Sequence, residues 1–196
     1  MPFHKSFKFK LRGKLAIGTG SQSPFDTTAL ITLHPIYGIP YIPGSAIKGV
    51  IRNSYIQSKF GRKESEALND KTFVKLFGID SGNDSGIVPG SAREKLIFFD
   101  AFLENYKLRY DVQTPHFKDY YDSFGKKQPR DTINPTLLYF PVVDGGSFTI
   151  HICGYNENCE FNDMEKVIKN AFTINGIGAK TALGYGLCFD DNVSSK

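Results

Sequence analysis

The sequence predicts an α+β fold in which an antiparallel sheet carries helices on one face. Segments with strand-like and helix-like periodicity follow one another in the order strand, helix, strand, strand, helix, strand. The chain has 196 residues, is 40% hydrophobic and contains 17 Phe and 10 Tyr, which is enough apolar surface for one folded domain over residues 1–196. This element order is that of the split βαβ, or ferredoxin-like, fold, and a glycine-rich loop precedes its last strand.

The first strand is predicted over residues 5–17, where apolar and polar residues alternate. One face of this strand is apolar (Phe7, Phe9, Leu11) and the other is basic (Lys8, Lys10, Arg12). The next stretch, 18–34, is rich in Gly, Ser and Thr, and the three prolines and two glycines of HPIYGIPYIPGS exclude regular structure. The chain therefore begins with a half-buried strand whose solvent face is positively charged.

Two helices follow this irregular stretch. Ser45 has the character of an N-cap, because apolar residues then recur at helical spacing until Gly61. Asp70 is the predicted cap of a second, short helix, which Gly78 ends.

Apolar runs predict three strands in the second half of the chain, at 95–103, 137–143 and 148–153. Asp100 interrupts the first of them, and the four residues Asp144 to Ser147 between the other two form a hairpin signal. The segment from about 109 to 136 is too long for a passive connection, so we expect an insertion there.

The last helix is predicted to begin at Asn162, which forms a capping-box pattern with Glu165, and to end at Asn175-Gly176. A glycine-rich segment follows, and the final strand is expected over 183–189. Together these elements complete the predicted sheet with its two main helices.

Positive charge is concentrated at the start of the chain. Residues 1–62 contain nine Lys and Arg and one acid, Asp26, whereas the whole chain carries a net charge of only +4. If this part folds onto one face, it offers phosphates a positive surface. The alternative is that these side chains only solvate a strand and a helix.

Cysteine and histidine spacing gives no indication of a disulfide framework, a metal site or a cofactor. Cys153, Cys159 and Cys188 form no CxxC pair, and the four histidines are far apart. No apolar run reaches the ~20 residues of a membrane span, and the amino terminus lacks the apolar stretch of a signal peptide. We therefore expect a soluble, cytoplasmic protein with no membrane partner.

The glycine-rich segment is the first candidate for chemistry. Gly176, Gly178, Gly184 and Gly186 frame Lys180 and Thr181, and glycines allow backbone amides to approach a phosphate closely. The segment fits neither a Walker A loop nor GxGxxG, which disfavours a nucleotide cofactor. The alternative is a glycine-rich connection without a ligand.

The helix that begins near Ser45 is the second candidate. Its amino-terminal amides and macrodipole favour an anion, and Lys48 and Arg52, one turn apart, would extend such a site along a phosphate backbone. A proline-stiffened entry to an ordinary helix remains the alternative.

The middle segment interleaves aromatic and basic side chains, a pattern that suits single-stranded RNA because rings stack unpaired bases and cations hold phosphates. The alternative is that the rings pack under the loop or against a partner. The residues concerned include His116, Tyr120, Lys126, Lys127 and Arg130.

Acid-base catalysis on RNA has candidates in His34, His116 and Tyr37, and Asp26 could assist a metal-dependent cut. None of them has a catalytic partner set by spacing, and no Ser/His/Asp or paired-carboxylate signature is present.

Four segments taken together resemble the RAMP superfamily of CRISPR-associated RNA-binding proteins: YGIPYIPGSAIKGVIR at 37–52, LFG at 76–78, Phe-Asp-Ala at 99–101 and GIGAKTALGYG at 176–186. TPHFKDYY at 114–121 and the later PRDTINPTLLYFPV are similar to the family of the sixth, end-capping subunit of the type III-B Cmr effector complex. The resemblance runs from about residue 7 to 189.

This resemblance implies an RRM-like core near the end of a helical backbone of related subunits, contributing to binding of the 3′ part of the guide RNA and its paired target. In that superfamily, target cutting belongs to a different subunit, which uses a loop aspartate and a metal ion. Asp26 lies in a comparable loop here, but its surroundings are similar to those of the capping family, so we assign it no catalysis.

We therefore expect a non-catalytic RNA-binding and assembly subunit whose partners are guide RNA, single-stranded target RNA and other RAMP subunits. The expected RNA-binding residues are Arg12, Ser45, Lys48, Arg52, Gly176, Gly178, Lys180, Thr181, Gly184 and Gly186. The middle-segment residues named above are expected to contact RNA or a partner. Two alternatives stay open: a metal-independent CRISPR RNA-processing endoribonuclease that uses His34 or His116, and a structural cap that touches only protein.

Overall fold

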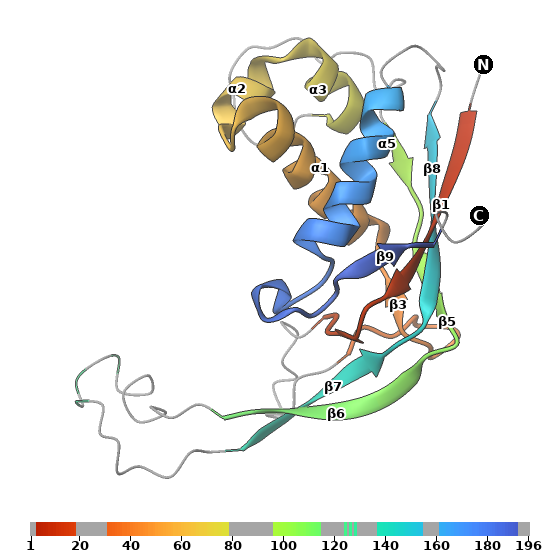
Figure 1. Ribbon diagram of the computed structural model, residues 1–196, viewed down its shortest axis with the longest axis vertical. Helices are drawn as coiled ribbons and strands as arrows, with labels where there is room; N and C mark the ends of the chain where they lie inside the picture. The colour runs from red at the N-terminus through yellow and green to blue at the C-terminus, as the bar shows by residue number, and fades with distance from the viewer. Residues whose placement is uncertain are drawn as a thin grey trace.

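The computed structural model describes residues 3–18, 31–78, 96–114, 124, 126, 128, 137–154 and 161–191, with side chains from residue 164 onward in the last range. Two helices, α1 (Gly44–Phe60) and α5 (Phe161–Asn170), lie side by side on one face of the main sheet (Figure 1). No described helix is long and apolar enough to cross a membrane.

The main sheet has the strand order β3-β5-β8-β1-β9, and β4 also pairs with β8. Every pairing is antiparallel, and β8 lies between β1 and β5 while β1 lies between β8 and β9. Each strand-helix-strand unit is therefore split by a strand of the other, which is the predicted ferredoxin-like arrangement. The strands are β1 (Phe3–Leu11), β3 (Tyr41–Ile42), β4 (Ile97–Phe98), β5 (Ala101–Glu104), β8 (Ser147–Gly154) and β9 (Cys188–Asp190).

The core fills the space between the sheet and its two helices. Phe9 of β1 stacks on Phe172 at 4.5 Å between ring centroids and lies 5.9 Å from Phe148 of β8, and all three are fully buried. Ile47 and Ile51 of α1 are also fully buried. The alternation predicted for the first strand is confirmed, because its apolar residues face this core.

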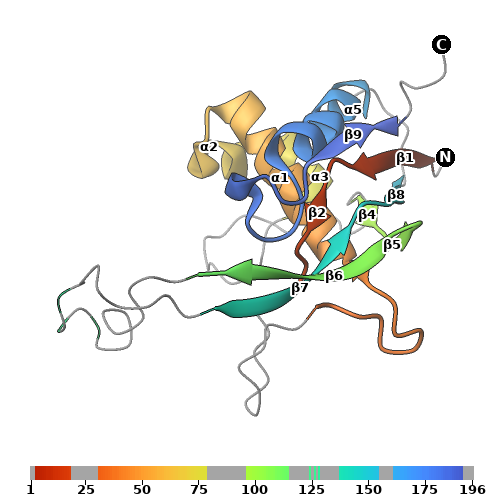
Figure 2. The ribbon, with the colours of Figure 1, turned by 60° about the horizontal axis from the view of Figure 1, so that its bottom comes forward.

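A second sheet continues from the first as a bent ribbon. It has the order β2-β7-β6, formed by β2 (Lys14–Leu15), β6 (Lys107–Gln113) and β7 (Leu138–Asp144). The β5–β8 register continues without a slip into the β6–β7 register. The ribbon therefore projects from the main sheet as an arm (Figure 2).

The hairpin predicted at Asp144 to Ser147 is wrong. β7 pairs with β6 and β2, whereas β8 pairs with β1, β4 and β5. Gly145 and Gly146 have φ angles of 67° and 96°, and Gly146 accepts a hydrogen bond from the amide of Leu11. These glycines bend a continuous strand from one sheet into the other, a task that L-residues with a Cβ perform poorly.

The predicted helix starts are confirmed for one helix and wrong for the other. The short helix α3 (Lys71–Phe77) begins as expected, because Asp70 accepts a 2.7 Å hydrogen bond from the amide of Phe73. The N-cap of α1 is Pro43, two residues before the predicted cap, so Ser45 lies in the first turn of the helix. The intervening α2 (Glu64–Asn69) has no counterpart in the prediction.

The chain after α5 is less regular than predicted. A π-helical turn over Ala171–Asn175 continues α5, and a 3-10 turn over Thr181–Leu183 takes up the start of the predicted last strand. β9 therefore begins only at Cys188.

Candidate nucleic-acid interface

The amino terminus of α1 already holds an anion of the chain itself. The amide of Gly44 donates a 2.7 Å hydrogen bond to Oδ1 of Asp100, which lies between β4 and β5. A Cβ at Gly44 would overlap the carbonyl oxygen of Phe98, so this helix end fits tightly against the sheet. The carboxylate uses the favourable end of the helix dipole that the sequence assigned to a phosphate.

Lys48 and Arg52, the two cations predicted along α1, both make contacts within the chain. Arg52 forms a 2.7 Å ion pair with Glu64 of α2 and lies over the ring of Phe73, 5.1 Å from its centroid. Lys48 is half-buried and interacts within the chain. RNA contact by Arg52 therefore stays a prediction, and within the chain its charge joins α1 to α2.

Three of the four loop glycines serve contacts within the chain. Gly178 has φ 88°, and a Cβ there would overlap the carbonyl oxygen of Ala16. Gly186 has φ 66°, donates its amide to Lys14 at 2.8 Å, and would overlap Ile177 if it had a Cβ. Gly176 is buried and has a Cβ position 3.2 Å from the Gly186 carbonyl oxygen.

The tip of the glycine-rich loop is more open. Gly184 is exposed, with nothing within 4 Å of its Cβ position, and Leu183 beside it is 74% exposed. Lys180 instead contacts the arm: its Nζ donates to Oε1 of Gln113 at 2.6 Å and lies 4.9 Å from the ring centroid of Phe140. Thr181 is half-buried at the start of the 3-10 turn. The structure therefore ties Lys180 to β6 and β7 and Arg52 to α2.

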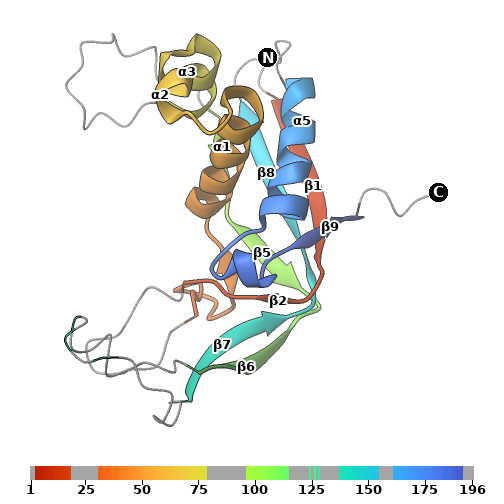
Figure 3. The same ribbon diagram turned by 60° about the vertical axis from the view of Figure 1, so that its left-hand side comes forward.

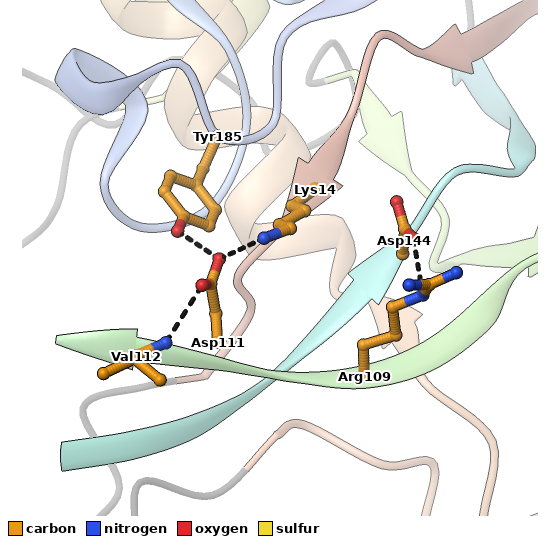
Figure 4. A network of polar contacts seen from close by, with 6 residues as sticks. All are labelled: Lys14, Arg109, Asp111, Val112, Asp144 and Tyr185. Atoms are coloured by element: carbon orange, nitrogen blue, oxygen red, sulfur yellow. Dashed lines mark hydrogen bonds and ion pairs between the residues drawn. The ribbon is translucent and has the colours of Figure 1, made fainter. Parts of the chain in front are cut away.

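A polar network fixes this loop to the arm (Figure 4). Asp111 of β6 accepts hydrogen bonds from Lys14 Nζ at 2.7 Å and from the Tyr185 hydroxyl at 2.6 Å. The hydrogen bond from Lys14, followed in importance by the one from Tyr185, lowers the pKa of Asp111 to about 2. The hydrogen bond to Asp111 raises the pKa of Tyr185 to about 12. Close by, Arg109 forms a 2.8 Å ion pair with Asp144.

The helices α1 and α5 cover one face of the main sheet and leave the other face of β1 open (Figure 3). Because Phe7, Phe9 and Leu11 are buried under the helices, alternation places Lys8, Lys10 and Arg12 on the opposite face. Lys8 and Lys10 are exposed, and no ion pair joins either to another described residue. These three residues are called the cationic ladder below.

Arg12 ends the cationic ladder in a fixed position. Its Nε donates to the carbonyl of Cys188 at 3.0 Å, and its guanidinium lies 4.7 Å from the ring centroid of Phe189. Phe189 is 53% exposed and lies opposite Lys10 in the β1–β9 register. The open face thus combines cations with an exposed ring, a combination that suits a single-stranded nucleic acid.

His34 is placed for a structural role. Its Nδ1 accepts hydrogen bonds from the amides of Ile36 at 3.3 Å and Tyr37 at 3.4 Å. A neutral ring that accepts at Nδ1 carries its proton on Nε2, and in that tautomer Nε2 cannot act as a general base.

Five of the sequence-predicted residues fall outside the described part of the chain: Asp26, His116, Tyr120, Lys127 and Arg130. Lys126 is described and exposed. Sequence reasoning missed the roles of Asp100 and Asp111, although the interruption of an apolar strand by Asp100 was a visible signal.

Comparison with known families gives one match over most of the chain: the model of the RAMP superfamily fits residues 8–189. The chain is 29% identical to the CRISPR system Cmr subunit Cmr6 of Pyrococcus furiosus over 91% of its own length and 66% of that protein's. It is 28% identical to the Cmr6 subunit of Saccharolobus solfataricus, over 80% and 47% of the two lengths. The chain thus spans about half to two thirds of these curated relatives.

Solved structures with a similar fold include two that contain Cmr proteins. The crystal structure of Cmr6 from Pyrococcus furiosus matches with a TM-score of 0.51 and 27% identity, over 97% of this chain and 99% of that one. A chain of a type III-B Cmr-beta complex bound to cognate target RNA matches with a TM-score of 0.64 and 24% identity, over 95% of this chain and 58% of that one. The second similarity shows the fold alone.

Proposed function

The chain belongs to the RAMP superfamily, and on that premise we propose that it is an RNA-binding and assembly subunit of a type III-B Cmr effector complex. Two curated relatives that are both named Cmr6 support this assignment. We propose that residues 1–196 form a single RAMP domain in which 109–136 is an insertion that begins within β6. Such a complex works on RNA inside the cell, so we infer a cytoplasmic location.

The observation that carries RNA binding is the cationic ladder. In an antiparallel strand, alternate residues are about 6.8 Å apart, so Lys8 and Lys10 are separated by that interval, and Arg12 follows directly after the end of β1. The only acid that alternation places on this face within the described strands is Glu104 of β5. A regular row of cations with little opposing charge suits the phosphates of an extended strand.

The RNA-binding set proposed on this basis differs from the one expected from the sequence. Lys8 and Lys10 join Arg12, whereas Arg52 and the three packed glycines leave the set because their contacts lie within the chain. Gly184, at the exposed tip of the loop, stays in the proposed RNA-binding set. Ser45 also stays in it, because it is exposed on the first turn of α1. Lys48, Lys180 and Thr181 are half-buried and would contribute only at the edge.

We infer that the subunit is non-catalytic. The hydrogen bonds at Nδ1 leave His34 without a lone pair at Nε2, which argues against its use as a general base. Incubation of the chain with CRISPR repeat RNA tests this point, since site-specific cleavage that is lost on His34→Ala or His116→Ala would establish the endoribonuclease alternative.

The assembly role is tested by coexpressing the chain with the other subunits of a type III-B complex and sequencing the RNA that co-purifies. We expect the chain to enter the complex and, after ultraviolet crosslinking, to carry adducts on β1. A complex that forms normally but carries RNA adducts only on its other subunits would support the structural cap instead. Failure of the chain to enter the complex would contradict the assembly role.

A further inference from the structure

Four aromatic side chains gather at the β3 edge of the main sheet. The ring of His34 stacks on Tyr37 with centroids 4.7 Å apart, and it lies 5.6 Å from Tyr41 and 5.5 Å from Phe102. Tyr41 of β3 and Phe102 of β5 are register partners, with centroids 6.2 Å apart. We call His34, Tyr37, Tyr41 and Phe102 the aromatic edge cluster.

A tight turn holds the aromatic edge cluster in place. The amide of Gly38 donates to the carbonyl of His34 at 2.8 Å, and Gly38 has φ 63°, which favours glycine. The amide of His34 donates to Ile39 at 2.8 Å, and the Nδ1 bonds from Ile36 and Tyr37 fix the orientation of the imidazole. The cluster is therefore built before any ligand arrives, which lowers the entropy cost of binding.

Tyr37 is the most exposed ring of the cluster. It is 67% exposed, with His34 stacked on its ring and Phe102 edge-on to it at 6.4 Å between centroids. A ligand that stacks on the cluster would use the exposed part of the Tyr37 ring. The amide of Gly38 bonds to the carbonyl of His34, and the amides of Ile36 and Tyr37 bond to His34 Nδ1, so the surface offers a ligand mainly the exposed Tyr37 ring.

The aromatic edge cluster and the cationic ladder share the open face of the main sheet. Ile42 and Ala101 are buried on the helix side, so alternation places Tyr41 and Phe102 on the open side. Figure 2 shows residues 31–40, in orange, extending past β5 on the side away from α1 and α5. Only β8 separates β5 from β1, and Thr149 of β8 is the register partner of Lys8.

We propose that the aromatic edge cluster stacks an unpaired base of a single-stranded RNA whose phosphates lie along Lys8 and Lys10. This inference rests on the proposed RNA-binding function and adds a binding site for a base to it. With strands about 4.8 Å apart, β3 and β1 are separated by roughly 14 Å, a distance that two or three nucleotides of an extended strand can span. Every base has a π-face, so the site would accept bases without strong sequence preference.

Charge favours RNA over a protein as the occupant of this face. A partner protein would cover the aromatic edge cluster with apolar side chains, but the same surface continues into Lys8 and Lys10, which carry no ion pair to other described residues. Rings next to unpaired cations are the combination that single-stranded nucleic acids require from a binding surface.

The test compares the binding of two oligomers to the 196-residue chain by fluorescence anisotropy: a labelled oligouridine and an abasic ribose-phosphate oligomer of equal length. Tyr37→Ala should weaken oligouridine binding about five- to 150-fold, the effect of losing one base-aromatic stack. Tyr37→Phe should bind like the wild type, since it keeps the ring. Tyr139→Ala, which removes a 55% exposed tyrosine of β7, is the matched control and should leave the dissociation constant unchanged.

The abasic oligomer separates stacking from charge. It should bind the wild type and Tyr37→Ala equally, because it has phosphates but no bases. The inference is overturned if Tyr37→Ala binds oligouridine as tightly as the wild type, or if Tyr37→Ala disrupts only association with another protein. Suppose that the wild type binds oligouridine, that Lys8→Ala/Lys10→Ala binds it more weakly, and that Tyr37→Ala binds it as tightly as the wild type. Base stacking at the aromatic edge cluster is then overturned, but the proposed RNA binding still stands. If the wild type binds no oligouridine, RNA binding by this chain fails as well.

Discussion

Replacing Asp111 by asparagine would keep the shape of the side chain but remove the charge that joins Lys14 of β2 to β6 (Figure 4). The Lys14 and Tyr185 hydrogen bonds hold the pKa of Asp111 at about 2, against an ordinary value of 3.8. By linkage, this difference corresponds to an upper limit of about 2.4 kcal/mol of stability at neutral pH. The Lys14 side chain is 43% exposed, so solvent screening reduces the expected loss to about 1–2 kcal/mol.

The pH dependence of this loss has a defined sign. The folded-state pKa of Asp111 is depressed, so its contribution is fully present above the unfolded-state pKa near 3.8 and disappears as the pH falls toward about 2. Urea unfolding of the wild type and Asp111→Asn at a series of pH values measures the difference. We expect the full difference at pH 7, with most of its decline between pH 4 and pH 2.

Asp144→Asn is the matched control, because Asp144 pairs with the 57% exposed side chain of Arg109 on the same arm. An exposed pair of this kind contributes about 0–1 kcal/mol. The reasoning about Asp111 is refuted if Asp111→Asn costs no more than Asp144→Asn at pH 7, or if its cost stays constant down to pH 2.

Two further predictions concern positions where the backbone is constrained. Gly186→Ala should destabilise the chain by about 3 kcal/mol or more, since it adds a Cβ that overlaps Ile177 at a positive φ. Gly184→Ala, at a positive φ but in open space, should cost only about 1 kcal/mol, and equal losses of thermal stability would contradict this account. Asp100→Ala should cost about 1 kcal/mol by removing the cap on Gly44. An unchanged midpoint of urea unfolding would show that the Asp100 bond contributes nothing.

Secondary-structure elements that are determined by residues close together in the sequence could be predicted. The period of two in β1 and the Asp70 cap of α3 are local patterns, and both are confirmed. The start of α1 was misplaced because its first amide bonds to Asp100, a residue 56 positions away. A distant cap of this kind leaves no signal beside the helix.

The candidate site illustrates the same limit. The glycine-rich segment adopts positive φ angles, as its glycines suggested, and contacts with Ala16 and Ile177 already require glycine at positions 178 and 186. Lys48 and Arg52 share one helix face at helical spacing, yet Arg52 is paired with Glu64 on a helix that the sequence did not predict. Only the cationic ladder follows directly from local alternation, and it is the part that the structure leaves open.

The salt dependence of RNA binding tests the central claim most directly. The affinity of the chain for a single-stranded oligonucleotide is measured over a series of salt concentrations for the wild type, Lys8→Ala/Lys10→Ala, and Lys71→Ala/Lys166→Ala. The last variant removes the same charge from exposed lysines of α3 and α5. If two phosphates lie on the cationic ladder, the Lys8/Lys10 variant should lower the slope of log K against log salt by about 1.4, and the Lys71/Lys166 variant should leave it unchanged. Equal slopes for the wild type and the Lys8/Lys10 variant would contradict an RNA path across the open face of the sheet.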